Sequence, residues 1–126
     1  MAWVASTALR NAWLDAIDTQ LGANAKWRIY DSTPTLLAEG LFNAAAALQA
    51  ATGGTITFNT IGSEADAPAS GTPSYIELLT SGDVVVLTGD CNETAGADAI
   101  LDEATITITD VVGWSAANSI FNAGNA

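Results

Sequence analysis

The N-terminal part of the chain shows a helical spacing of apolar residues. Leu9, Trp13, Ile17 and Leu21 recur every four residues, and the polar residues Arg10, Asn11, Asp15 and Asp18 lie largely off this line. This spacing predicts an amphipathic helix over residues 6–21 whose apolar stripe faces the core. A Ser-Thr pair precedes the stripe and a glycine follows it, as expected of capping residues at the two ends of a helix.

After the helix, apolar and polar residues alternate, which is typical of β-strands. The predicted strands are residues 26–30, 36–41, 55–61, 74–80, 83–88 and 105–109. A Ser-Gly pair at 81–82 indicates a hairpin turn. The continuous apolar run at 84–87 predicts a strand covered on both faces. The alanine-rich residues 42–51 fit a helix or an extended course equally well.

The number and spacing of these segments define a fold class. Six to seven short strands preceded by one N-terminal amphipathic helix predict a mainly β protein. We expect an antiparallel β-sandwich or a jelly-roll-like barrel with the helix packed on it. The length of 126 residues fits one domain. We assign residues 6–112 to that domain, 1–5 to an N-terminal arm and 113–126 to a C-terminal arm.

Both arms carry large apolar side chains, namely Trp3 before the helix and Trp114, Ile120 and Phe121 after the last predicted strand. Large apolar groups near chain ends need a partner surface. Each arm either folds back on its own domain or docks on a neighbouring subunit. Trp13 lies on the helix stripe and is expected to be a core or interface anchor. These five residues form the predicted interface set.

The charge distribution is strongly asymmetric. The three basic residues lie within the first 28 positions, the remaining residues include twelve acids, and the net charge is −11. A large net negative charge repels phosphate backbones and anionic lipids, so we expect no nucleic-acid and no membrane partner. The apolar stretch near the N-terminus has no basic residue before it and contains acids, unlike a signal peptide, so we expect synthesis in a cytoplasm.

Residue types that carry chemistry are scarce. The chain has no histidine and a single cysteine, Cys91, which we expect to be a small, partly buried structural residue. The acidic residues 90–98 fail the spacing of a calcium loop because Leu101 stands where the twelfth-position carboxylate belongs. Asp102 and Glu103 have no evident partner carboxylate for sugar hydrolysis. We therefore expect a protein that is not an enzyme and holds no metal or cofactor.

Residues 7–17, Thr-Ala-Leu-Arg-Asn-Ala-Trp-Leu-Asp-Ala-Ile, resemble the opening helix of a family of small structural proteins of tailed bacteriophages and prophages. Members of that family commonly begin with a Thr-x-x-Arg-Asn-x-x-Leu-Asp helix. Further similar segments are residues 27–30, the Leu-Leu-Ala-Glu at 36–39, the hairpin at 74–89 and residues 96–108. The resemblance covers most of residues 7–112, is loose between 43 and 73, and ends after Val112.

The resemblance implies a virion structural protein, with capsid decoration, or cement, as the leading role. Such a protein would lie on the outer surface of the head as a homo-oligomer and bridge neighbouring major capsid subunits. A tail or neck component is one alternative. Another is a carbohydrate- or host-binding module that uses Tyr75 or a tryptophan as a stacking platform. A hydrolase that uses two acidic residues is a further hypothesis.

Overall fold

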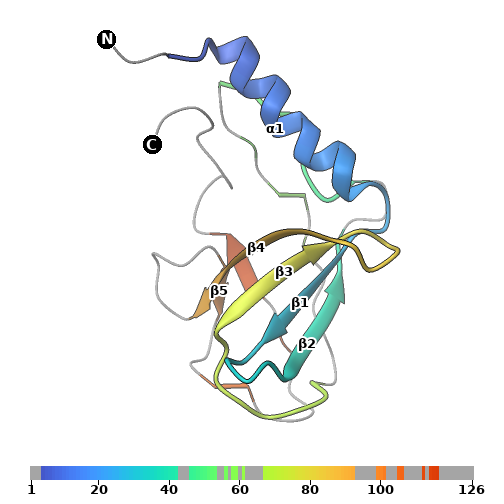
Figure 1. The fold of residues 1–126 in the computed structure, drawn as a ribbon, viewed down its shortest axis with the longest axis vertical. Helices are drawn as coiled ribbons and strands as arrows, with labels where there is room; N and C mark the ends of the chain where they lie inside the picture. The colour runs from blue at the N-terminus through green and yellow to red at the C-terminus, as the bar shows by residue number, and fades with distance from the viewer. Residues whose placement is uncertain are drawn as a thin grey trace.

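The computed structural model describes residues 4–42, 46–53, 56, 58–59, 61, 67–92, 99–101, 105–106, 112 and 114–116. Figure 1 shows the arrangement of the elements found in these ranges. They are, in chain order, α1 (Thr7–Leu21), β1 (Lys26–Tyr30), β2 (Leu36–Leu41), β3 (Tyr75–Leu79), β4 (Val85–Asn92), β5 (Ala99–Leu101) and β6 (Trp114–Ala116). The predicted class, mainly β with one N-terminal helix, is confirmed.

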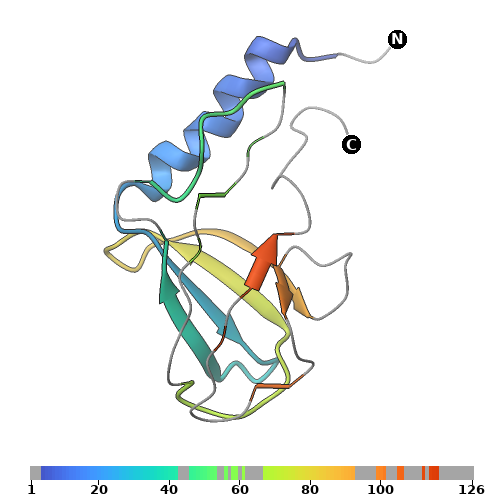
Figure 2. The same cartoon turned by 180° about the vertical axis from the view of Figure 1, so that it is seen from behind.

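Four strands form an antiparallel sheet in the order β2-β1-β3-β4, and the two shortest strands extend it in the order β5-β6 (Figure 2). The β4–β5 pairing is parallel, with Cys91 opposite Ala99. This pair departs from the antiparallel arrangement that the sequence predicted. Over the described residues the four-stranded sheet is open, and no closed sandwich or barrel is seen there.

The central strand β1 shows why the sheet has two different faces. Trp27 and Ile29 are buried, whereas Lys26, Arg28 and Tyr30 are only partly buried. Successive side chains of a strand point to opposite faces, so the alternation predicted from the sequence separates apolar from polar positions. We call the face with Lys26, Arg28 and Tyr30 the outer face of the sheet.

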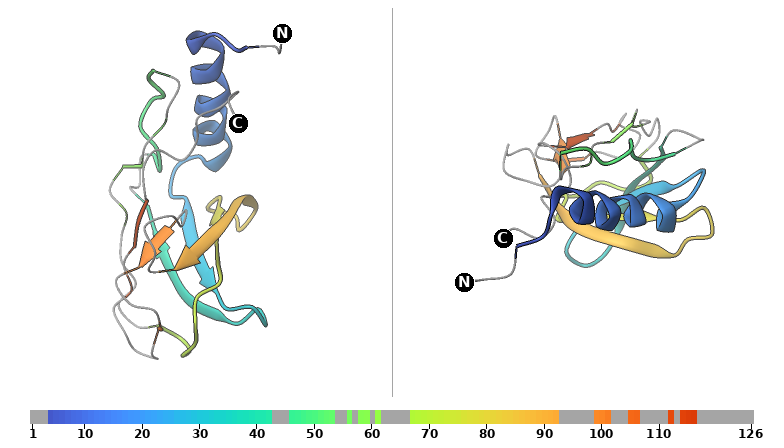
Figure 3. Two further views of the ribbon diagram at one scale, coloured as in Figure 1. Left: turned by 90° about the vertical axis from the view of Figure 1, so that its left-hand side faces the viewer. Right: turned by 90° about the horizontal axis from the view of Figure 1, so that it is seen from above.

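Short pairings form a second layer over the apolar face (Figure 3). They are the isolated bridges Phe42–Ile61, Leu48–Phe58 and Gly71–Ile106. The rings of Phe42 and Phe58 stack with their centroids 5.5 Å apart, and Ile56 and Ile106 belong to the same buried cluster as Trp27. The predicted strands at 55–61 and 105–109 are therefore represented, in the residues that can be described, by single bridges instead of ladders.

The ends of α1 are those that the sequence predicted. The Ser6 hydroxyl accepts a hydrogen bond from the Leu9 N–H at 3.1 Å. This bond satisfies one of the free donors of the first helical turn. At the other end, Gly22 has a φ of 70° and its N–H donates to the Asp18 carbonyl at 2.9 Å. A positive φ at this position favours glycine over any residue with a Cβ.

The predicted apolar stripe of the helix is partly wrong. Leu14 and Leu21 are the buried helix residues, while Leu9 and Trp13 are 44% and 46% exposed. A spacing of four residues drifts by about 40° per step around an α-helix, so four such residues cannot all face one core. The core-facing side is centred on Leu14 and Leu21, and Leu9 and Trp13 lie on its flank.

The position of α1 follows from this small buried face. Figure 3 shows the helix at the end of the sheet, with its N-terminal half extending beyond the strands. It contacts β4. The residues 46–53 run beside it (Figure 2). They contain no helix, so the alanine-rich segment takes an irregular course in its described part, with isolated bridges at Phe42 and Leu48.

The β3–β4 hairpin forms at the predicted Ser-Gly pair, but its apolar run is not covered on both faces. The Thr80 N–H donates to the Val84 carbonyl at 2.9 Å and closes the turn. Val84 and Val85 are exposed. The prediction was wrong because the run begins inside the turn, where the chain projects beyond the neighbouring strands.

The start of the expected C-terminal arm is among the described residues. Trp114–Ala116, at the start of the expected C-terminal arm, pairs with β5 of its own chain. Residues 1–3 and 117–126 lie outside the described residues. Within the described part of the chain, no helix combines the length and apolar character that crossing a bilayer requires.

Candidate functional site

Two large apolar side chains on one side of α1, Leu9 and Trp13, are exposed to solvent. Val4, just before the helix, is 75% exposed as well. Trp13 is the one member of the predicted interface set whose side chain the structure places. We call Leu9 and Trp13 the helix flank. The structure also describes the backbone of Trp114 in β6, but Trp3, Ile120 and Phe121 lie outside the described residues.

Two aspartates fix the rotation of the helix. The Asp15 carboxylate accepts a hydrogen bond from the Ala51 N–H at 2.7 Å, and the Asp18 carboxylate accepts one from the Leu48 N–H at 3.2 Å. These bonds attach residues 48–51 to one side of α1. Trp13 lies about 160° around the helix axis from Asp15, because successive residues are about 100° apart. The helix flank therefore faces away from the attached segment.

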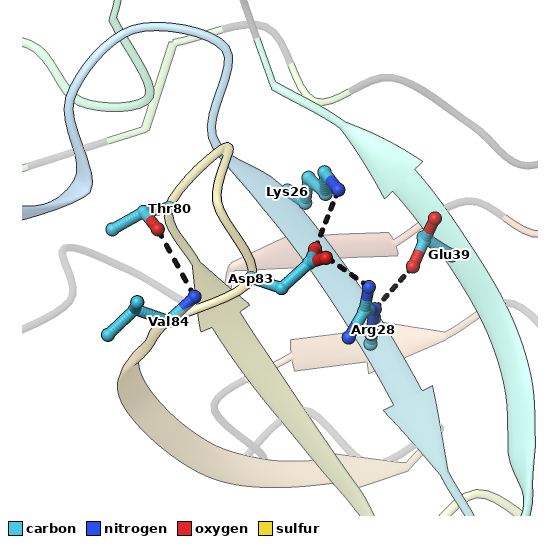
Figure 4. A network of polar contacts seen from close by, with 6 residues as sticks. All are labelled: Lys26, Arg28, Glu39, Thr80, Asp83 and Val84. Carbon is cyan, nitrogen blue, oxygen red and sulfur yellow. Dashed lines mark hydrogen bonds and ion pairs between the residues drawn. The ribbon is translucent and has the colours of Figure 1, made fainter.

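A polar network crosses the outer face of the sheet (Figure 4). The Asp83 carboxylate accepts from Lys26 Nζ at 2.6 Å and from Arg28 Nη2 at 2.9 Å. Arg28 Nε donates to the Glu39 carboxylate of β2. Asp83 has a φ of 68° and lies in the β3–β4 turn. Asp83 therefore links the hairpin tip to β1 by ion pairs. Arg28 in turn links β1 to β2 through its ion pair with Glu39.

The contacts of this network shift the pKa values of Asp83 and Arg28. The hydrogen bond from Lys26, aided by the charges of both bases, holds the pKa of the Asp83 carboxyl below its usual value. The hydrogen bond to Glu39 is the main cause of the raised pKa of Arg28. Lys26 and Arg28 are thus engaged within the chain. The sequence predicted the strands that carry Lys26, Arg28 and Glu39, but no sequence feature indicated that Asp83 would form ion pairs with these bases.

An aromatic pair lies beside the network. Tyr30 and Tyr75 are opposite each other in the β1–β3 ladder, and their rings stack with centroids 5.1 Å apart. Burial, followed by a hydrogen bond to Glu77, raises the pKa of Tyr30. Tyr75, the expected stacking platform for a sugar, therefore already has one ring neighbour. Both rings are partly buried on the outer face.

Cys91 has the environment of a structural residue. It lies near the end of β4 and is 1% exposed. Burial, together with the nearby Asp90 charge, raises the pKa of its thiol to about 12. The thiolate is the nucleophilic form of cysteine, and it is scarce at neutral pH with such a pKa.

The acidic clusters considered for metal binding or hydrolysis fall largely outside the described residues. Asp90 and Asn92 lie in β4, whereas 93–98 and 102–104 are not described. No group of three or more potential metal-ligating side chains occurs among the residues whose positions are given. The expectation that this protein holds no metal and has no catalytic activity stays a prediction.

Comparison of the chain with protein-family models, with curated proteins and with solved structures found no match. The function must therefore be inferred from the helix flank, the outer face and the resemblance noted in the sequence.

Proposed function

We propose that this chain is a structural protein of a tailed-phage virion, and that it decorates the outer surface of the head as a cement protein. In this role it is a homo-oligomer that bridges neighbouring major capsid subunits and carries no catalytic site. The observation that supports this role best is the helix flank, because it places an exposed aromatic and an exposed aliphatic side chain on a projecting helix. The resemblance of residues 7–17 to phage structural proteins supports the same role.

The exposed apolar groups favour a function in protein contact. Single exposed apolar residues are common, but here Leu9 and Trp13 are one helical turn apart and share one side of α1. Tryptophan is among the residues that contribute most when protein interfaces form. A cement protein would insert such apolar side chains into sites on the surface of the assembled shell.

The charge of the chain is compatible with the outside of a head. With a net charge of −11, the protein would be repelled by packaged DNA. No such penalty applies on the outer surface, where the chain meets protein on one side and solvent on the other. The same charge keeps copies soluble before they assemble.

The proposal includes the closed fold that the sequence predicted. A sandwich or jelly-roll-like barrel requires the second layer of bridges over the apolar face to continue as paired strands. The buried positions of Ile56, Phe42 and Ile106 are consistent with such a layer.

The alternative as a sugar-binding module draws on one observation, the Tyr30–Tyr75 pair on the outer face. Flat aromatic surfaces favour stacking with apolar ligand faces. A tail or neck component would use the same helix flank in a different assembly. Neither alternative requires catalytic residues.

Fractionated particles separate these roles. Virions of the phage or prophage that encodes this chain would be split into heads and tails, and each fraction would be probed with an antibody to the chain. We expect the protein in the head fraction, at a fixed ratio to the major capsid protein. Recovery with the tails would assign the tail or neck role. Absence from both fractions would overturn the virion proposal, and glycan-array binding would then test the sugar-binding module.

A further inference from the structure

We draw no further inference here: the strongest candidate, the exposed apolar patch that Leu9 and Trp13 form on α1, belongs to the site already described, and nothing in the described part of the structure shows what covers it.

Discussion

The indole ring of Trp27 lies over Gly40, its partner on the neighbouring strand β2, and leaves no room for a side chain there. A Cβ built on Gly40 would come within 2.8 Å of the indole Nε1 and closer still to two ring carbons. Trp27 is completely buried and belongs to the core. The largest side chain of the core therefore depends on the absence of a side chain on the adjacent strand.

A Gly40→Ala substitution should destabilise the protein. The added methyl forces Trp27 or the β1–β2 pair to shift, and overpacking of this kind costs about 1–3 kcal/mol. Urea unfolding followed by tryptophan fluorescence measures the loss. Gly82→Ala is a matched control, because a Cβ there meets only the Thr80 hydroxyl at 3.7 Å. The control should stay within about 0.5 kcal/mol of the wild type, and equal effects at both sites would contradict the packing of Trp27 on Gly40.

An Asp83→Asn substitution should weaken the β3–β4 hairpin tip at neutral pH. Asparagine tolerates the positive φ of this position, so the change removes the charge and keeps the backbone. The folded-state pKa of Asp83 is lowered, so its contribution to stability is present above the unfolded value of 3.8 and is lost as the pH falls through the folded value. The difference in urea midpoint between wild type and variant should therefore shrink below about pH 4.

Added salt tests the charge contribution of Asp83 independently, again by comparing the wild type with Asp83→Asn. The side chain of Asp83 is about half exposed, so its ion pairs are open to screening. One molar sodium chloride should reduce the wild-type advantage at pH 7. A difference that persisted at low pH and in high salt would show that Asp83 acts through its turn geometry and not through its charge.

An Asp15→Ala substitution should release residues 48–51 from the helix. It removes the acceptor of the Ala51 N–H, and loss of one such bond costs about 1 kcal/mol. Hydrogen exchange measured by NMR should show faster exchange of the Ala51 amide. Asp15→Asn keeps an oxygen acceptor and should retain most of the protection. Unchanged protection in the alanine variant would mean that another group holds this segment.

Cys91 should resist alkylation in the folded protein. Its thiol is buried and has a pKa of about 12, so iodoacetamide at pH 8 should modify it only after unfolding. Mass spectrometry with and without urea measures this protection. Rapid labelling of the native protein would contradict the burial of Cys91 in β4.

The local elements of the fold were largely predictable from the sequence. The alternation in β1, the strand β2, the Ser-Gly turn and both helix caps depend on neighbouring residues, and each was found where the sequence placed it. Such features depend on periodicity and backbone chemistry that act over a few residues. The full closure of the strands into a sandwich stays a prediction, because it depends on pairings between distant segments.

The features of the candidate site were harder to predict because they depend on tertiary contacts. Leu9 and Trp13 fit an apolar stripe, but the position of the sheet decides which residues α1 buries, and Leu14 takes the inner place. Asp15 and Asp18 lie off the predicted apolar stripe, and their acceptance of hydrogen bonds from distant N–H groups has no sequence signal. The need for a residue without a side chain at Gly40 likewise follows from a tertiary contact, the packing of the Trp27 ring over it.

Cryo-electron microscopy of the complete particle tests the central claim most directly. The claim is that this chain decorates the head and contacts the shell through α1. The account predicts density for the chain on the outer surface of the head, across boundaries between capsid subunits, with Leu9 and Trp13 against the shell. A head map without this density, or one in which the helix flank faces solvent, would contradict it.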